Sequence, residues 1–191
     1  IFIKEFPRDN ENQVLQLNIM KNYTNITNNK AFTLLQFRKD ERKGKNTKGL
    51  MLINNSNGVV NWSRELDVTS FPGEDFEFKI IPSKERNLLV LIAGSSSMVI
   101  VFDADTGNDV WENRFSESCK LKIWNDKILE QNCDENYIAL WDPINQSEEW
   151  RYAPQNQIQS FYREKNSYNE NPVLIANLNN DNIEAINLNS G

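Results

Sequence analysis

One short motif recurs four times along the chain and constrains its fold more than any other feature. Each copy begins with a large apolar residue followed by Asn or Asp, and three copies carry Gly four positions after that Asn or Asp. The copies occupy residues 53–58, 102–107, 141–146 and 186–191, and the third has Gln146 in place of Gly. In the first three copies a Trp follows four positions later. A polar turn with an aromatic residue at a fixed distance behind it predicts a structural repeat.

The motif has the chemistry of a tight β-hairpin. An Asn or Asp side chain accepts hydrogen bonds from backbone N–H groups two residues ahead, and Gly takes the positive φ that closes a short turn. The Trp then lies on the outgoing strand, where its ring can pack against a neighbouring sheet. Gln146 would be strained in the Gly position, so we expect a wider or differently built third turn. The repeat residues are Asn54, Gly58, Trp62, Asp103, Gly107, Trp111, Asp142, Trp150, Asn187 and Gly191.

Segments of strand length lie between the turns, three leading into each turn and one leaving it. The expected strands are 15–19, 31–37, 50–53, 59–66, 76–81, 88–92, 98–102, 109–115, 121–124, 127–130, 137–141, 148–152, 158–162, 173–176 and 183–188. Residues 1–6 look like the outgoing strand of an earlier unit. We therefore expect the last strand of a preceding unit at 1–7, units at 12–66, 75–115 and 119–152, and an incomplete unit at 157–191.

Four-stranded units with a period of about 40–50 residues are typical of β-propeller blades. The predicted fold class is therefore all-β: a partial β-propeller of about four four-stranded antiparallel blades, from a larger protein. A β-sandwich is the structural alternative. It would not require the same turn at the same place in every group of four strands.

Residues 101–111 resemble the repeat of the PQQ-like, or quinoprotein-like, β-propellers, in which Asp-x-x-Thr-Gly is followed by Trp. Asp103, Thr106, Gly107 and Trp111 carry the resemblance. The stretch 141–150, with a Trp on each side of a polar turn, is similar to the lumenal propeller of subunit 1 of the ER membrane protein complex. These resemblances imply blade architecture and leave the activity open, because one fold hosts many functions.

The composition argues against several classes of function. The chain has no His, which removes Ser-His-Asp and Cys-His catalysts and His-based zinc sites. Its net charge of −6 without a basic stripe argues against nucleic acid as a partner. The basic residues at 38–45 are interrupted by two acids and are expected in a solvated loop. No apolar run approaches the ~18 residues of a transmembrane helix, so we expect no membrane span in this segment.

We expect no catalytic residue, cofactor or metal site in the chain, and hence no enzyme. Quinone-dependent dehydrogenases of the resembled family use adjacent cysteines, a calcium ion and a catalytic Asp, whereas Cys119 and Cys133 are not adjacent. Acidic residues at alternate positions in 103–109 are similar to a calcium loop. That stretch lacks the Glu that ends an EF-hand loop, and the repeat explains the same residues as a blade turn.

Two features favour an oxidising compartment, the ER lumen or the extracellular space. Cys119 and Cys133 are expected to be cross-strand neighbours, and a disulfide between them would contribute on the order of 3 kcal/mol. Two buried free thiols are the alternative. N-glycosylation motifs make Asn22, Asn25, Asn54 and Asn145 candidate acceptors, and we expect Asn22 and Asn25 in an exposed loop between strands.

The predicted function is a non-catalytic scaffold that binds other protein subunits, as the lumenal or extracellular part of a larger membrane-associated assembly. One alternative is a quinoprotein-type enzyme whose active residues lie outside this segment. Another is a cytosolic or ciliary interaction propeller of the WD type. The absence of Gly-His pairs and of Trp-Asp pairs at blade ends disfavours the WD type, since the sole Trp-Asp pair, at 141–142, precedes a turn.

Overall fold

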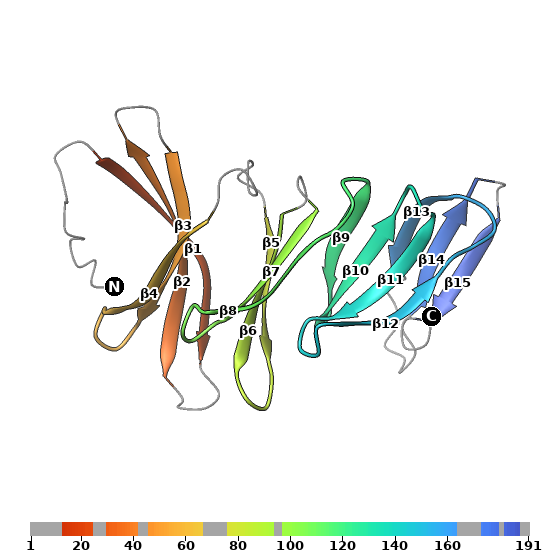
Figure 1. The fold of residues 1–191 in the computed structure, drawn as a ribbon. Helices are drawn as coiled ribbons and strands as arrows, with labels where there is room; N and C mark the ends of the chain where they lie inside the picture. Colours follow the sequence, from red (N-terminus) through yellow and green to blue (C-terminus); the bar gives the residue numbers. More distant parts are fainter. Residues whose placement is uncertain are drawn as a thin grey trace.

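The computed structural model describes residues 13–24, 30–41, 46–66, 76–93, 97–163, 173–179 and 182–187. Within these ranges the regular elements are β-strands, which form antiparallel sheets one after another along the chain (Figure 1). In the described part of the chain, no helix has the length and hydropathy that a membrane span requires. The strand expected at residues 1–6 and the repeat residue Gly191 lie outside it.

Each sheet is a meander in which strands adjacent in sequence are paired. The first sheet consists of β1 (Gln13–Thr24), β2 (Ala31–Glu41), β3 (Asn46–Asn54) and β4 (Val60–Leu66). The second consists of β5 (Glu77–Pro82), β6 (Asn87–Ala93), β7 (Met98–Asp103) and β8 (Asp109–Arg114). The third consists of β9 (Cys119–Trp124), β10 (Lys127–Asn132), β11 (Tyr137–Asp142) and β12 (Ser147–Tyr152). The fourth consists of β13 (Ile158–Arg163), β14 (Val173–Leu178) and β15 (Ile183–Asn187). The all-β fold of consecutive antiparallel blades predicted from the repeat is confirmed.

One predicted loop is wrong at its beginning. Residues 38–41 continue β2 and are not part of the connection to β3. The physical reason is that β1 and β3 both extend far enough to pair with this end of β2: Arg38 lies opposite Gln16 on one side and Lys48 on the other. Backbone pairing does not depend on the charge of the side chains, so a charged run can extend a strand.

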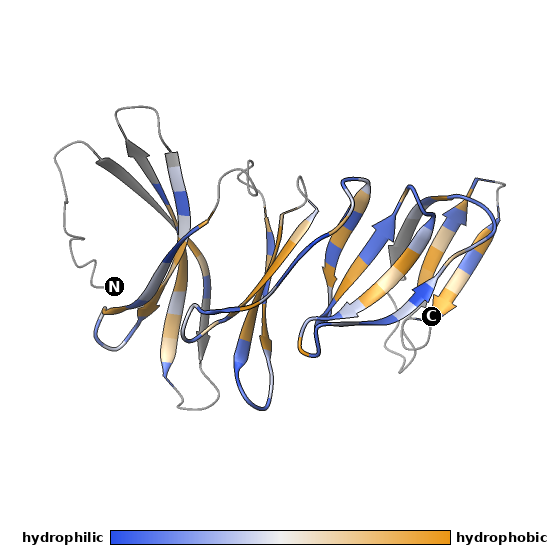
Figure 2. Cartoon of the chain, in the orientation of Figure 1, coloured by the Kyte–Doolittle hydropathy of each residue, from blue (hydrophilic) through white to orange (hydrophobic). Residues whose placement is uncertain are grey.

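The two central strands of the second sheet, β6 and β7, are apolar because both faces of the sheet are covered. Every residue of β6 is buried. Alternate residues point to opposite faces of a sheet: Leu89 and Leu91 pack in a cluster with the first sheet, whereas Val90 and Ile92 pack in a cluster with the third. A strand covered on both faces needs a continuous apolar run, and Figure 2 shows hydrophobic residues along β6 and β7 and hydrophilic ones along β8 and at the β5–β6 connection.

A hydrophobic cluster fills each boundary between neighbouring sheets. Each of these three clusters includes one of the repeat tryptophans among its partly buried members: Trp62 at the first boundary, Trp111 at the second and Trp150 at the third. Each Trp lies on the last strand of its own sheet, and its cluster contains residues of the following sheet. Burial of apolar surface, at about 25 cal/mol per Å², therefore holds successive sheets face to face.

The three described copies of the motif form the same turn. The Oδ1 atoms of Asn54, Asp103 and Asp142 accept hydrogen bonds from the backbone N–H two residues ahead, at 2.9, 2.9 and 2.7 Å. After each turn the pairing of the last two strands shifts by one residue just before the Trp. This shared bulge gives the three tryptophans the same place relative to their turns.

The expectation of a wider third turn is wrong. Gln146 adopts φ 57°, close to the 68° of Gly58 and the 74° of Gly107. The left-handed conformation costs a residue with a side chain about 1 kcal/mol, which the turn can tolerate. The space around the position decides whether a side chain fits there. A Cβ on Gly107 would lie 2.7 Å from Cδ2 of Trp62, whereas Gln146 is exposed.

Substitutions at these turn positions separate backbone strain from packing. We expect Gln146→Gly to raise the free energy of unfolding by about 1 kcal/mol, because the strain at positive φ disappears. We expect Gly107→Ala to lower the free energy of unfolding by ~2–3 kcal/mol, because the new methyl overlaps the Trp62 ring and the alanine is also strained at positive φ. Urea unfolding followed by Trp fluorescence measures both. Gly58→Ala is the matched control, since nothing lies within 4 Å of its added Cβ; an equal loss in the two Ala variants would contradict the packing argument.

Candidate functional site

The first boundary is closed by two side chains of β4 that reach the β7–β8 turn of the next sheet. Trp62 Nε1 donates a hydrogen bond of 3.0 Å to the carbonyl oxygen of Ala104, and its ring covers Gly107. Two positions further on, Arg64 Nη1 forms an ion pair of 2.7 Å with Asp109. The repeat Trp and the repeat Gly therefore form one contact between neighbouring sheets.

The second boundary contains an aromatic cluster. The rings of Trp111 and Trp141 stack with their centroids 6.3 Å apart and their planes at 27°. Phe115 meets Trp141 edge-on at 5.4 Å and 82°. Trp141 belongs to the third sheet and the other two residues come from the second sheet and the segment after it. Aromatic pairs of this kind contribute about 0.5–1.5 kcal/mol beyond the area they bury.

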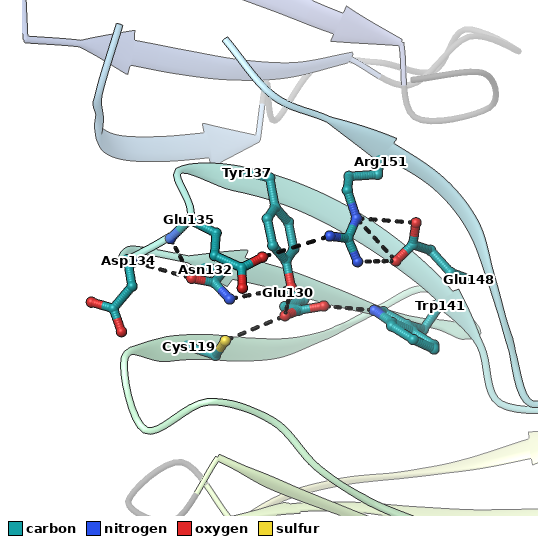
Figure 3. A network of polar contacts seen from close by, with 9 residues as sticks. All are labelled: Cys119, Glu130, Asn132, Asp134, Glu135, Tyr137, Trp141, Glu148 and Arg151. Carbon is teal, nitrogen blue, oxygen red and sulfur yellow. Dashed lines mark hydrogen bonds and ion pairs between the residues drawn. The ribbon is translucent and has the colours of Figure 1, made fainter. Parts of the chain in front are cut away.

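A buried carboxylate lies behind this cluster, in the middle of β10 (Figure 3). Glu130 is 1% exposed. Its Oε1 accepts hydrogen bonds from the Tyr137 hydroxyl at 2.7 Å and from Cys119 Sγ at 3.3 Å, and its Oε2 accepts one from Trp141 Nε1 at 2.7 Å. An ionised carboxylate is costly to bury without partners. Three donors from β9 and β11, the two neighbours of β10, surround this one, so Glu130 ties β10 to both adjacent strands.

Glu130 was not among the functional residues predicted from the sequence. The available signal was a glutamate in the second strand of a blade, directly after the apolar residues Ile128 and Leu129. The strand pattern alone does not show which donors surround such a residue. Tyr137, Trp141 and Cys119 meet it only because the register of β10 with both of its neighbours places them there.

Burial and the carboxylate of Glu130 set the pKa values of the two ionisable donors beside it, the Tyr137 phenol and the Cys119 thiol. Burial, with the hydrogen bond to Glu130, raises the pKa of Tyr137 to about 12 and that of Cys119 to about 12. Losing either proton would place a second negative charge next to the buried carboxylate. The Arg151 guanidinium, 3.8 Å from the centre of the Tyr137 ring, covers the cluster and pairs with Glu148 at 2.6 Å. At neutral pH the phenol and the thiol are therefore protonated donors, and Cys119 is not an activated nucleophile.

The predicted disulfide is not formed, because Cys119 and Cys133 are both free thiols. Cys119 lies directly opposite Asn132 in the pairing of β9 with β10. Because alternate residues point to opposite faces of a sheet, the residue after Asn132 does not point to the side on which Cys119 lies. Cys119 instead donates to Glu130, and Cys133 lies in the β10–β11 turn.

The raised pKa of Cys119 predicts a loss of stability in alkali. The unfolded chain releases this proton near pH 9.0, whereas the folded chain keeps it until about 12. The contribution to stability is therefore complete below pH 9 and is lost between pH 9 and about 12, at up to about 1.4 kcal/mol per pH unit. Urea unfolding across this range measures the slope. Cys119→Ser keeps a hydroxyl donor to Glu130 and should have a shallower slope, whereas Cys133→Ser should match the parent; equal slopes in all three proteins would contradict the assignment.

Two residues with positive φ tie one sheet to the first strand of the next. Ser97, with φ 47°, directly precedes β7 and donates through Oγ to the carbonyl oxygen of Cys119 at 2.9 Å. Asn136, with φ 54°, directly precedes β11 and accepts through Oδ1 from the backbone N–H of Ile158 at 2.8 Å. The two residues hold equivalent places in successive blades, and each partner is the first residue of the following sheet. This inter-blade latch was not predicted from the sequence, where its only signal is a small polar residue before a third strand.

The side chain of Asn136 can be removed without disturbing its backbone. Its Nδ2 also donates to the carbonyl oxygens of Pro154 and Asn156, at 3.2 and 3.0 Å. Asn136→Gly keeps the positive φ and loses all three bonds, so we expect the free energy of unfolding to fall by ~1–3 kcal/mol. Asn125→Gly is the control, since Asn125 is exposed at φ 51° in the β9–β10 turn. Urea titration compares the two variants; a similar effect of both would mean that the latch contributes nothing.

The third turn is tied to its own sheet in a different way from the first two. The backbone N–H groups of Asn55 and Ala104 donate to the first residue of the second strand, at 3.0 and 2.8 Å. Pro143 occupies the equivalent position and has no N–H. Lys127, the first residue of β10, instead places Nζ 2.9 Å from Asp142 Oδ2. Burial alone would raise the pKa of Asp142, but Lys127 and the backbone donors of the turn hold it below its usual value.

The acidic residues of 103–109 are engaged in the structure as a turn. Asp103 Oδ1 accepts from the N–H groups of Asp105 and Thr106, at 2.9 and 3.0 Å, and Asp109 pairs with Arg64. Within the described ranges, no group of three or more His, Cys, Asp or Glu side chains is arranged to hold a metal ion. The last repeat residue in those ranges, Asn187, ends β15.

The candidate glycosylation sites differ in accessibility. Asn22 lies within β1 and not in the expected loop, because β1 extends to Thr24; Asn25 lies outside the described residues. Asn54 is 9% exposed and caps its own turn. Asn145 is exposed, and its Nδ2 donates to Asp142 Oδ2 at 2.7 Å. Of these four, Asn145 is the acceptor with a described, exposed side chain.

Comparison with known proteins yields distant likenesses in fold. No family model matches the chain, and no curated protein matches it. Among solved structures, BBS1N in complex with ARL6DN gives a TM-score of 0.47 at 9% identity, over 90% of this chain and 50% of that one. Sqt1 of Saccharomyces cerevisiae gives 0.43 at 12% identity, over 89% of this chain and 60% of that one. The dihydro-heme d1 dehydrogenase NirN in complex with DHE gives 0.45 at 9% identity, over 91% and 48%.

The chain thus spans between 48% and 60% of the length of these structures. Similarities of this degree say nothing about activity or partners. The PQQ-like assignment and the likeness to subunit 1 of the ER membrane protein complex stay predictions. The four consecutive antiparallel sheets and the clusters between them make the chain a run of β-propeller blades.

Proposed function

We propose that the chain is a non-catalytic β-propeller scaffold that binds other protein subunits, in the lumenal or extracellular part of a larger membrane-associated assembly. The observation that supports this proposal is the use of its buried polar groups. The Glu130 carboxylate accepts from three donors of its own sheet, and Asp142 is held by Lys127 and by its turn. These groups are engaged in holding strands together, and the exposed turns at the sheet edges are left as binding surfaces.

The inter-blade bonds also favour a scaffold, because they hold those turns in fixed places. Trp62 and Arg64 attach one sheet to the turn of the next, and Ser97 and Asn136 attach two sheets to the strand that follows. A surface that is ordered before binding loses less conformational entropy when a partner binds. Rigid display of turns is what a scaffold requires.

A scaffold should occur in a stable complex. We expect the native full-length protein, purified under mild conditions, to elute with other protein subunits at fixed stoichiometry in size-exclusion chromatography with light scattering. Mass spectrometry of the peak identifies the subunits. A protein that elutes at its own mass without stoichiometric partners, in buffers of low and moderate ionic strength, would refute the scaffold role.

The proposed compartment has its own test. If the chain faces the ER lumen or the extracellular space, the native protein should lose mass when treated with an N-glycosidase, because oligosaccharyltransferase acts on exposed Asn-x-Ser/Thr motifs. Gel mobility and intact-mass measurement report the change. A native protein of unmodified mass would contradict this location.

A further inference from the structure

The third repeat turn carries an apolar residue where the other two carry polar ones. Two residues after the capping Asn or Asp stand Ser56, Asp105 and Ile144. Ser56 Oγ donates to Asn54 Oδ1 at 2.7 Å, and Asp105 accepts from Asn87 Nδ2 at 3.3 Å, so both polar side chains serve their own blade. The Ile144 side chain is 39% exposed, although its backbone N–H makes the usual turn bond. The turn depends on the backbone hydrogen bond of Ile144 and not on its side chain.

Ile144 lines a groove that crosses the boundary between the second and third sheets. The groove has a volume of about 720 Å³ and is open to solvent on one side. This volume lies within the range of about 300–1,000 Å³ found for sites that hold small ligands. The lining residues are Pro82, Ser83, Lys84, Glu85, Arg86, Leu88, Ile144 and Asn145. One wall is thus the β5–β6 connection and the other is the β11–β12 turn, and both lie along the lower edge of the sheets in Figure 1.

The charge of the groove opposes that of the chain. Lys84 and Arg86 place two positive charges on one wall against the single negative charge of Glu85, while the chain as a whole carries −6. Within the described ranges, the charged side-chain groups of Lys84 and Arg86 make no ion pair or hydrogen bond, and the bonds between Arg86 and Ser83 involve the Arg86 backbone. Two cations are too few to follow a nucleic-acid backbone. They are sufficient to attract carboxylates that accompany an apolar group.

Both walls are held in place before anything binds. In the β5–β6 connection, Ser83 N–H and Oγ donate to the carbonyl oxygen of Arg86, at 3.1 and 2.7 Å. In the facing turn, Asp142 accepts from the Ile144 N–H at 2.7 Å and pairs with Lys127 at 2.9 Å. Preformed walls lower the entropy cost of binding a short, flexible segment.

We propose that this groove binds a short linear segment of a partner protein in which an apolar side chain lies next to Asp or Glu. The apolar side chain packs against Ile144 and Pro82, and the carboxylates face Lys84 and Arg86. The inference rests on the proposed scaffold function and names the chemistry of the segment that one of its surfaces recognises.

Selection from random heptapeptides displayed on phage, with the full-length protein as bait, tests the chemistry of the segment. We expect enriched peptides to combine Leu, Ile, Val or Phe with an excess of Asp and Glu. Enrichment of basic peptides, of apolar peptides without acids, or of no peptide at all would overturn the proposal.

The most enriched peptide, labelled with fluorescein, then locates the site by fluorescence anisotropy. We expect Ile144→Asp to weaken binding about tenfold and Lys84→Glu at least threefold, as for an apolar anchor and a rim charge. Val59→Asp and Lys120→Glu are the matched controls, because both side chains are exposed and neither lines the groove. Circular dichroism melts check that all four variants fold. Equal affinities for the groove and control variants would overturn the assignment of the site.

Two further measurements separate this inference from the function on which it rests. If native subunits co-purify with the parent protein and equally with Ile144→Asp, the scaffold role stands and the groove assignment fails. If no subunit co-purifies with the parent protein, the scaffold role itself fails. Sedimentation that shows a dimer of the parent protein, lost in Ile144→Asp, would identify a second copy as the occupant and overturn the assignment to a partner protein.

Discussion

The structure depends on burying both faces of sheets that are apolar on both sides. The second sheet shows this most clearly, since every residue of β6 is buried and its side chains belong alternately to the cluster with the first sheet and the cluster with the third. Such a sheet exposes hydrocarbon on whichever face lacks a neighbour. Stability in this chain is therefore a property of the boundaries between blades, and the single blade is not the unit of stability.

The boundaries follow one plan but differ in chemistry. At the first, an indole lies on glycine and donates to the neighbouring turn; at the second, Trp111 and Trp141 stack, and Trp141 donates inward to Glu130. The shared bulge puts the repeat Trp in the same place each time, and the residue it meets varies. This variation explains why Gln146 can stand where the other turns have Gly. Each turn is free to diverge where no ring of the preceding blade covers it.

The divergence of the third blade connects the fold with the proposed function. Pro143 removes a backbone donor that the other turns use, and Lys127 replaces it by binding Asp142. The turn is held by that ion pair and by its backbone bonds, so the side chain of the residue after Pro143 is not needed to stabilise the blade. That residue is Ile144, which lines the basic groove. A repeat protein can acquire a binding surface in this way, since one turn changes its exposed residue while the backbone of the turn stays the same.

The sequence by itself determined the strands, their grouping and the repeat turn, because these depend on local chemistry: an Asx cap, a positive φ and apolar runs of strand length. It did not determine which side chains meet across strands and blades. The donors around Glu130, the latch from Asn136 to Ile158 and the separation of Cys119 from Cys133 all depend on register and on the packing of successive sheets. Register fixes the face of the sheet on which each residue lies, and a shift by one residue would move these side chains to the opposite face and break the contacts. Register is set by the pairing and packing of whole strands, so only the tertiary structure decides which side chains meet.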